Sequence, residues 1–260
     1  MTYDLAFYAS GALSGALVGF ILALVGGGGS ILATPLIVYF VGVREPHIAI
    51  GTSALAVGLN AMLGVYGHAR RGNVAWRPAV WFAGAGVLGA LLGSILGKAF
   101  DGQRLLFLFA ILMIVVGALM LRRRTATDEA GDGRDAPVRT SFYGLTTGVF
   151  SGFFGIGGGF LIVPGLTAAT GMAMIRAIGT SLVAVAAFGL ATAASYAWSG
   201  LIDWRLAAVF VTGGFLGSLS GTALSHRLSR TDGLLRRIFA GLIFVVAAYM
   251  LWKSGSAVFA

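Results

Sequence analysis

Two glycine clusters, each followed by a proline, hold the residues whose types and spacing could do chemistry in this chain. The first cluster reads GGGGSILATP at 26–35 and the second reads GIGGGFLIVP at 155–164. The pentapeptide AIGTS follows each of them, at 49–53 and at 177–181. Glycine reaches positive φ without strain and lets a ligand approach the backbone, while hydroxyl groups donate hydrogen bonds. Together with helix N-termini, these groups are typical of a binding site for a small anion.

The predicted substrate-binding residues come from these motifs and from one isolated amide within an apolar stretch. They are Gly27, Gly28, Gly29, Ser30, Thr52, Ser53, Asn60, Gly157, Gly158, Gly159, Thr180 and Ser181. An alternative stays open for each, because glycine and hydroxyl residues also pack membrane helices, and serine and threonine also bond to carbonyls of their own helix. An amide such as Asn60 also forms interhelical bonds. The spacings Gly89/Gly93 and Gly217/Gly221 predict helix packing alone.

The composition predicts that the elements carrying these residues lie in a membrane. Of the 260 residues, 58% are hydrophobic and only 10% are charged, and the mean hydropathy is +0.91. So few polar residues cannot coat a soluble globule. Uncharged stretches of about twenty residues recur, which is the length that crosses roughly 30 Å of hydrocarbon as a helix. The alternation typical of a membrane β-barrel is absent, so the sequence predicts an all-α polytopic membrane protein.

The chain divides into a first transmembrane repeat at 1–121, a polar linker at 122–140 and a second transmembrane repeat at 141–260. Matching motifs recur along the two halves at an offset of 128 or 129 residues, which predicts an internal duplication. Besides the glycine clusters and AIGTS, a turn motif is repeated: Gly72, Trp76 and Arg77 align with Gly200, Trp204 and Arg205. A Trp-Arg pair at the start of a helix is typical of an interfacial anchor.

Each half contains five apolar elements, and this odd number predicts that the halves have opposite orientations in the membrane. The positions of the Lys and Arg residues agree if residue 1 lies outside and the linker is cytoplasmic. Such an inverted repeat is typical of secondary transporters. The predicted elements lie at 5–25, 30–43, 48–68, 76–98 and 104–121, and at 141–155, 159–172, 176–199, 204–226 and 236–252.

The elements at 30–43 and 159–172 are too short to span the membrane, because a helix of that length covers only about 21 Å. Each glycine cluster therefore predicts a helical hairpin that dips into the bilayer with the glycines at its tip. Backbone of this kind survives at membrane depth where it is buried in protein or lines a polar cavity. A helix that begins after each cluster would point its unpaired N–H groups into that cavity.

Other functional classes find little support in the sequence. The chain has no cysteine, its three histidines do not have metal-ligand spacing, and its acidic residues lie near helix ends or in loops. We therefore predict no enzyme activity, no metal and no cofactor. The formal charge of +9 reflects topology signals, and no nucleic-acid partner is expected. An anion or ion channel or facilitator with a glycine-tip filter remains an alternative, as does a structural membrane subunit, and the formation of a homo-oligomer is left open.

The duplicated glycine hairpin with its proline, the two AIGTS copies and the turn G-x-[VI]-x-W-R resemble the sulfite exporter TauE/SafE family, also called the toluenesulfonate uptake permease family. The resemblance spans about residues 10–253. It implies a bacterial inner-membrane permease for small sulfur oxyanions or organosulfonates, such as sulfite or sulfoacetate. We expect a transporter that exports such an anion by alternating access, with the small anionic substrate and the lipid bilayer as its partners. Because Ser30 follows the GGGG run and Phe160 follows the GIGGG run, the two tips are expected to contribute unequally, the second being less polar.

Overall fold

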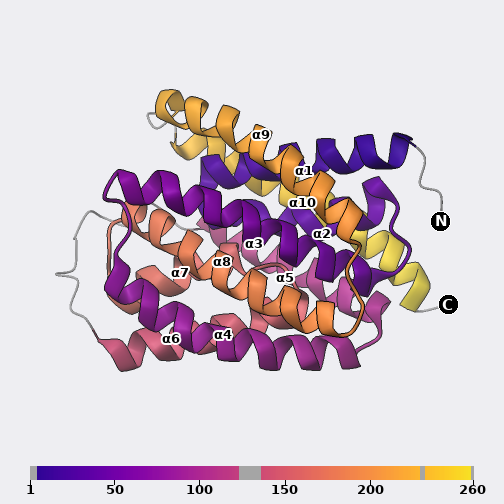
Figure 1. Ribbon diagram of the computed structural model, residues 1–260, viewed down its shortest axis with the longest axis horizontal. Helices are drawn as coiled ribbons and strands as arrows, with labels where there is room; N and C mark the ends of the chain where they lie inside the picture. The colour runs from indigo at the N-terminus through magenta and orange to yellow at the C-terminus, as the bar shows by residue number, and fades with distance from the viewer. Residues whose placement is uncertain (1–4, 123–135, 229–231, 259–260) are drawn as a thin grey trace.

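The computed structural model describes residues 5–122, 136–228 and 232–258, and these form a bundle of helices (Figure 1). Two irregular helical segments, the 3₁₀ helix η1 and the π-helical turn η2, flank the short helix α2. The elements are α1 (Leu5–Val25), η1 (Gly26–Leu32), α2 (Ala33–Pro35), η2 (Leu36–Val41), α3 (Pro46–Arg70), α4 (Trp76–Ala99), α5 (Gly102–Arg122), α6 (Pro137–Phe154), α7 (Gly159–Thr170), α8 (Met174–Trp198), α9 (Trp204–Leu228) and α10 (Asp232–Val258).

The prediction of an all-helical membrane protein agrees with the structure. Among the described residues, five helices are long and apolar enough to cross a membrane. A lipid environment favours helices because each backbone N–H and C=O group finds its partner within the helix. These candidate spans are Leu5–Ala23, Pro46–Arg70, Trp76–Ala99, Gly102–Leu119 and Arg176–Trp198.

Small residues let two pairs of helices pack with their backbones close together. Helix α4 packs along α6, and helix α1 packs along α9 (Figure 1). A Cβ atom on Gly89 or Gly93 would meet the carbonyl of Leu145 or Val149 on α6. The predicted packing role of these spacings is therefore confirmed, and the same holds for Gly217 and Gly221, which face α1. The α6 residues Gly144, Gly148 and Gly152 likewise face the carbonyls of Phe82, Gly86 and Ala90 on α4.

Helices α3 and α8 pack against each other between these two pairs, and α5 packs against α10. Helix α3 runs antiparallel to α8, since Gly51 near the start of α3 lies against Tyr196 near the end of α8. Helices α4, α6 and α8 begin at one end of the bundle, which we call the linker end. The start of α1 and the end of α10 lie at the opposite end, which we call the terminal end (Figure 1). The centre of the bundle is therefore built mainly from the middle turns of α3 and α8.

Candidate functional site

The second glycine cluster forms a turn between α6 and α7. The backbone is left-handed at Gly155, Gly157 and Gly158, with φ of 64°, 63° and 67°. Helix α7 then begins at Gly159, and the N–H groups of Leu161 and Ile162 donate to the Gly158 carbonyl. The predicted use of glycine for positive φ is therefore confirmed at this cluster, where a residue with a side chain would be strained.

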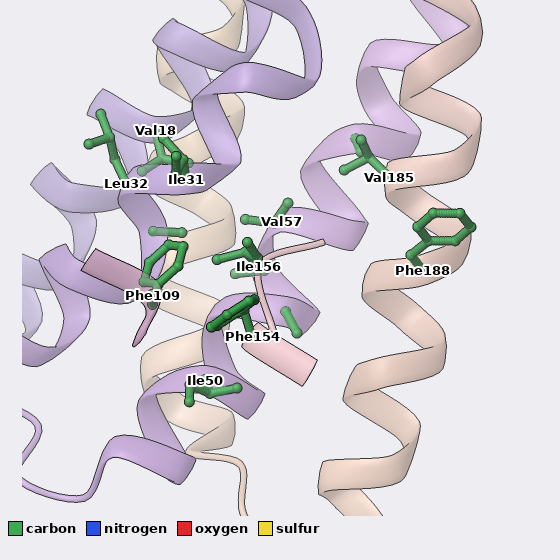
Figure 2. Packing of buried hydrophobic residues seen from close by; sticks show 14 of the residues in the cluster. Val18, Ile31, Leu32, Ile50, Val57, Phe109, Phe154, Ile156, Val185 and Phe188 are labelled. Carbon is green, nitrogen blue, oxygen red and sulfur yellow. The ribbon is translucent and has the colours of Figure 1, made fainter. Parts of the chain in front are cut away.

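This turn lies deep in the bundle. A Cβ atom on Gly157 would lie 3.1 Å from Val57 Cγ1 and 3.6 Å from Val185 Cγ1. Val57 and Val185 are buried near the middle of α3 and α8. Figure 2 shows Ile156 beside Val57 among the buried apolar side chains, and Ile156 is only 1% exposed. The second cluster thus brings non-helical backbone to the middle of the two central helices.

The hairpin formed by α6 and α7 starts and finishes at the linker end. The Arg139 guanidinium, in the first turn of α6, donates to the Ala168 carbonyl near the end of α7 at 2.6 Å. Helix α7 has 12 residues and so covers only about 18 Å. The return arm therefore begins well inside the bundle, as a dipping hairpin requires.

The first glycine cluster has a different backbone. Residues 26–32 form the 3₁₀ helix η1, and the chain continues through α2 and η2 without a left-handed turn. The expected break, with a free helix N-terminus after the glycines, does not occur here. Glycine instead allows the backbone of η1 to lie close to α1, because a Cβ atom on Gly29 would collide with the backbone of Leu22. Gly27, Gly28 and Ser30 lie in the same 3₁₀ helix.

Behind the first cluster, hydroxyl groups form a hydrogen-bonded pair that has no counterpart at the matching position of the second half. Ser30 and Thr34 are fully buried, and the hydroxyls of Thr34 and Ser53 are hydrogen bonded at 2.8 Å. Ser53 Oγ also donates to the Ile50 carbonyl. In the second half, Ser181 Oγ donates to the Ile178 carbonyl of its own helix at 2.7 Å. Valine occupies position 163, which matches Thr34 at the repeat offset, so this half lacks the second hydroxyl.

The threonines of the two AIGTS copies hold turns in the opposite half of the chain. Thr52 Oγ1 accepts a hydrogen bond from the Asp203 N–H, and Thr180 Oγ1 accepts one from the Ala75 N–H, both at 3.0 Å. The glycine before each threonine lies directly against the same turn. The repeated AIGTS sequence is therefore explained first by docking on the G-x-[VI]-x-W-R turn of the other half.

Asn60 is a buried amide without a hydrogen-bond partner for either its nitrogen or its oxygen. The residue is 2% exposed and lies against Gly214 of α9, where a Cβ atom would overlap the Asn60 amide. Phe188 occupies the position that matches Asn60 in the second half and lies against Gly86 of α4 in the same way. An unsatisfied buried amide is unfavourable, so it marks a place where a polar ligand or water would be stabilised.

Two hydroxyl residues near the clusters were missed by sequence reasoning. Ser151 Oγ is buried without a hydrogen-bond partner, and a Cβ atom on Gly158 would lie 2.7 Å from it. Thr34 bonds to Ser53 as described above. Thr34 lies inside the quoted GGGGSILATP motif, and Ser151 lies one turn before the second cluster, so both could have been found by extending the motifs.

The structure brings part of the predicted set together. Segment η1, with Gly27 to Ser30, contacts both α7, which begins at Gly159, and α8. Ser53 joins this region through Thr34, whereas Thr52 and Thr180 are bonded to turns at opposite ends of the bundle. The result is a region of glycine backbone and uncharged hydroxyl groups inside an apolar bundle, which suits weak binding of a small polar or anionic solute.

The model of the sulfite exporter TauE/SafE family matches residues 11–250, nearly the whole chain. The chain belongs to this family. Its relatives carry transporter names, and this TauE/SafE member is accordingly a multi-pass protein of a membrane transporter family. The resemblance inferred from the glycine hairpins and AIGTS is thus confirmed.

Curated relatives match over most of their length. A "Probable membrane transporter protein" of Xylella fastidiosa (strain Temecula1) is 53% identical over 93% of this chain and 94% of its own. The "Probable membrane transporter protein YunE" of Bacillus subtilis is 26% identical over 88% of this chain and 93% of its own. A similarly named protein of Methanocaldococcus jannaschii is 25% identical over 91% of this chain. No solved structure matches the chain significantly.

Proposed function

We propose that this protein is a secondary transporter that exports sulfite or a similar small sulfur oxyanion or organosulfonate by alternating access. The observation that carries the proposal is the left-handed glycine turn at 155–158, which lies against the middle of α3 and α8. Irregular backbone at that depth would expose amide groups to a solute. The substrate class itself rests on the name of the family.

The proposed binding region combines both glycine clusters with the buried polar side chains around them. Gly28, Gly29, Ser30 and Ser53 would contribute from the first half, and Gly157, Gly158 and Gly159 from the second. Asn60 would supply an amide donor. Thr52, Thr180 and Ser181 remain in the proposed set, but the hydrogen bonds that the two threonines accept from the turns favour a structural role for them. With no lysine or arginine in this region, an anion would be held weakly enough to leave again.

Alternating access would follow from two inverted repeats, at 1–121 and 141–260, on either side of a cytoplasmic linker at 122–140. The exchanged pairing of helices supports this proposal, since the fourth helix of each half packs along the first helix of the other. Gly15 and Gly19 face the carbonyls of Phe210 and Gly214, while Gly144 and Gly148 face those of Phe82 and Gly86, which are matching positions in the two halves. Rocking of one half against the other would expose the central region to each side in turn.

Export would be favoured by the membrane potential in a bacterial inner membrane. Moving one negative charge out of a cell with a negative interior gains about 2.3 kcal/mol per 100 mV. Export of a sulfur oxyanion therefore needs no coupling ion, whereas uptake would need one.

The test is sulfite efflux from liposomes that contain the purified protein, under an imposed potential of either sign, with sulfate, sulfoacetate and chloride as competitors. A carrier gives saturable flux that follows the potential and is inhibited by the organosulfonate. A flux that does not change with the membrane potential would contradict electrogenic export. A conductance that does not saturate with anion concentration would identify a channel. Absence of flux with every anion would leave a structural membrane subunit as the better account.

Two matched variants test which half holds the substrate. Each serine hydroxyl donates to a carbonyl of its own helix, but Ser53→Ala also removes a hydrogen bond to Thr34, which Ser181 does not have. We expect kcat/KM for sulfite to fall roughly threefold to tenfold in Ser53→Ala, as the loss of one hydrogen bond predicts, and less in Ser181→Ala. Unchanged kinetics in both variants would assign the serines to packing.

A further inference from the structure

A pocket of about 290 Å³ opens at the linker end of the bundle, away from the glycine turn. The turn before α4 and the first residues of that helix form one wall, and the connection from α7 to α8 forms the other. The lining residues are Val74, Ala75, Trp76, Arg77, Pro78, Thr170, Met172 and Arg176. This volume accommodates a small solute or a lipid headgroup.

The pocket combines positive charge with apolar surface. Arg77 comes from α4 and Arg176 from α8, so two separate elements contribute a guanidinium group. Among the described lining residues, none is acidic. Arginine presents a planar set of donors that matches the oxygens of sulfonate, sulfite and phosphate groups. Met172 and Pro78 provide an apolar wall for the substituent of such a group.

The duplication supplies an internal comparison at the terminal end. At the repeat offset, Trp76 and Arg77 match Trp204 and Arg205, but Arg176 matches Ile48 and Ala75 matches Asp203. Met172 matches Arg44, so the matching positions carry two arginines, Arg44 and Arg205, together with the carboxylate of Asp203, which has no counterpart in the linker-end pocket. The Asp203 carboxylate accepts hydrogen bonds from the N–H groups of Arg205 and Leu206, which fixes it at the start of α9. An oxyanion is disfavoured beside this carboxylate.

We propose that the linker-end pocket binds an oxyanion group, with Arg77 and Arg176 on its oxygens and the apolar wall on its substituent. It would make the two ends of the transporter unequal, with the higher anion affinity at the linker end. The oxyanion could belong to a free sulfur anion in solution or to a phospholipid headgroup, because both present the same tetrahedral or pyramidal charged oxygens. If the protein transports sulfur oxyanions, this pocket would bind them before transport, and that role rests on the proposed function. The binding of an oxyanion in the pocket does not depend on transport.

The first experiment measures the binding of ethanesulfonate and of inorganic phosphate by titration calorimetry, with the full-length protein in phosphatidylcholine nanodiscs. We expect Arg176→Ile, which installs the residue of the matching position, to raise Kd roughly fivefold to twentyfold, as the loss of one charge-assisted contact at a partly exposed site predicts. Arg77→Gln should act in the same direction. The matched control Arg205→Gln, at the terminal end, should leave Kd unchanged.

Thermal unfolding of each variant separates a loss of binding from a loss of fold, and Arg176→Lys keeps the charge if Arg176→Ile is unstable. Unchanged affinity in both Arg176→Ile and Arg77→Gln would overturn the proposal. An equal loss in Arg205→Gln would also overturn it, because binding would then reflect general surface charge.

The source of the oxyanion is resolved by adding phosphatidylglycerol to the nanodiscs. If the pocket holds a lipid phosphate, phosphatidylglycerol will compete and raise the Kd for ethanesulfonate in the unmodified protein but not in Arg176→Ile. If it holds a free anion, the Kd will not depend on this lipid.

Flux measurements keep the two proposals apart. Binding that depends on Arg176 without any sulfite flux would sustain this site and refute the proposed function. A flux that falls in Ser53→Ala, together with a Kd that is unchanged in Arg176→Ile, would refute this site and sustain the proposed function. With both proposals correct, Arg176→Ile raises KM from the linker side and leaves kcat unchanged.

Discussion

At 155–158 the chain turns through three left-handed glycines, whereas at 26–29 a similar glycine run continues as a 3₁₀ helix. The turn separates two helices and carries backbone to the middle of the bundle. The 3₁₀ helix instead lies close against α1, contains the buried hydroxyl of Ser30 and is followed by that of Thr34. Similar glycine sequences therefore serve two purposes: the second half supplies an unusual backbone, and the first half supplies polar side chains.

The largest expected effect follows from the left-handed turn. Gly158→Ala places a side chain at φ 67° and brings its Cβ 2.6 Å from Ser151 Cβ, so backbone strain and steric overlap add. We expect a loss of about 2–5 kcal/mol in the free energy of unfolding. The control is Gly42→Ala, which has φ 88° but no atom within 4 Å of its added Cβ, and should lose only about 1–2 kcal/mol.

Denaturant unfolding in detergent, followed by circular dichroism, measures both variants. If Gly158→Ala is no less stable than Gly42→Ala, the tight turn does not exist as described. In that case the two glycine clusters would not differ as they do here.

The second effect concerns the polar character of the first half. Asn60→Leu removes an unpartnered buried amide, so stability should stay equal or rise, because no hydrogen bond is lost. If the amide contacts the substrate, kcat/KM for sulfite falls at least tenfold. The matched variant Phe188→Leu should show the opposite pattern, with about 1–2 kcal/mol lost from packing against Phe82 and normal flux.

Efflux assays and unfolding curves on the same preparations measure this pair. Wild-type flux in Asn60→Leu would remove the amide from the binding region, and the difference in polarity between the halves would then have no bearing on transport.

The smallest expected effect is the same in both halves. Thr52→Val and Thr180→Val each leave one turn N–H without its hydroxyl partner, so each should cost about 1 kcal/mol. The two costs should add in the double variant, because the sites lie at opposite ends of the bundle. KM for sulfite should not change. A rise in KM in either single variant would show that its threonine contacts the substrate as well as the turn.

Sequence reasoning located the helices well, and the reason is local. Predicted element 5–25 coincides with α1, and 76–98 differs from α4 by one residue at its end. The prediction failed at 30–43, where 3₁₀ and π turns replace one regular helix. A glycine-rich sequence can form either a left-handed turn or a 3₁₀ helix. Which of the two forms depends on the backbone against which the segment packs.

The candidate site was only partly accessible from the sequence. The glycines, Ser53 and Asn60 stand out by type, but the partner of each hydroxyl lies far along the chain. Thr52 bonds to a turn 151 residues away, and Ser53 bonds to a residue 19 positions earlier. The pocket between Arg77 and Arg176 likewise joins two helices whose proximity no local pattern reveals.

The sequence by itself determined the membrane setting, the helical class, the motifs shared by the two halves and the family, because apolar runs of spanning length and repeated motifs are properties of the linear chain. Only the tertiary structure decided that AIGTS docks on the turn of the opposite half, that one glycine cluster breaks the helix while the other does not, and that two arginines share a pocket. These features depend on which backbones approach each other across the bundle, and that approach is set by packing over the whole molecule.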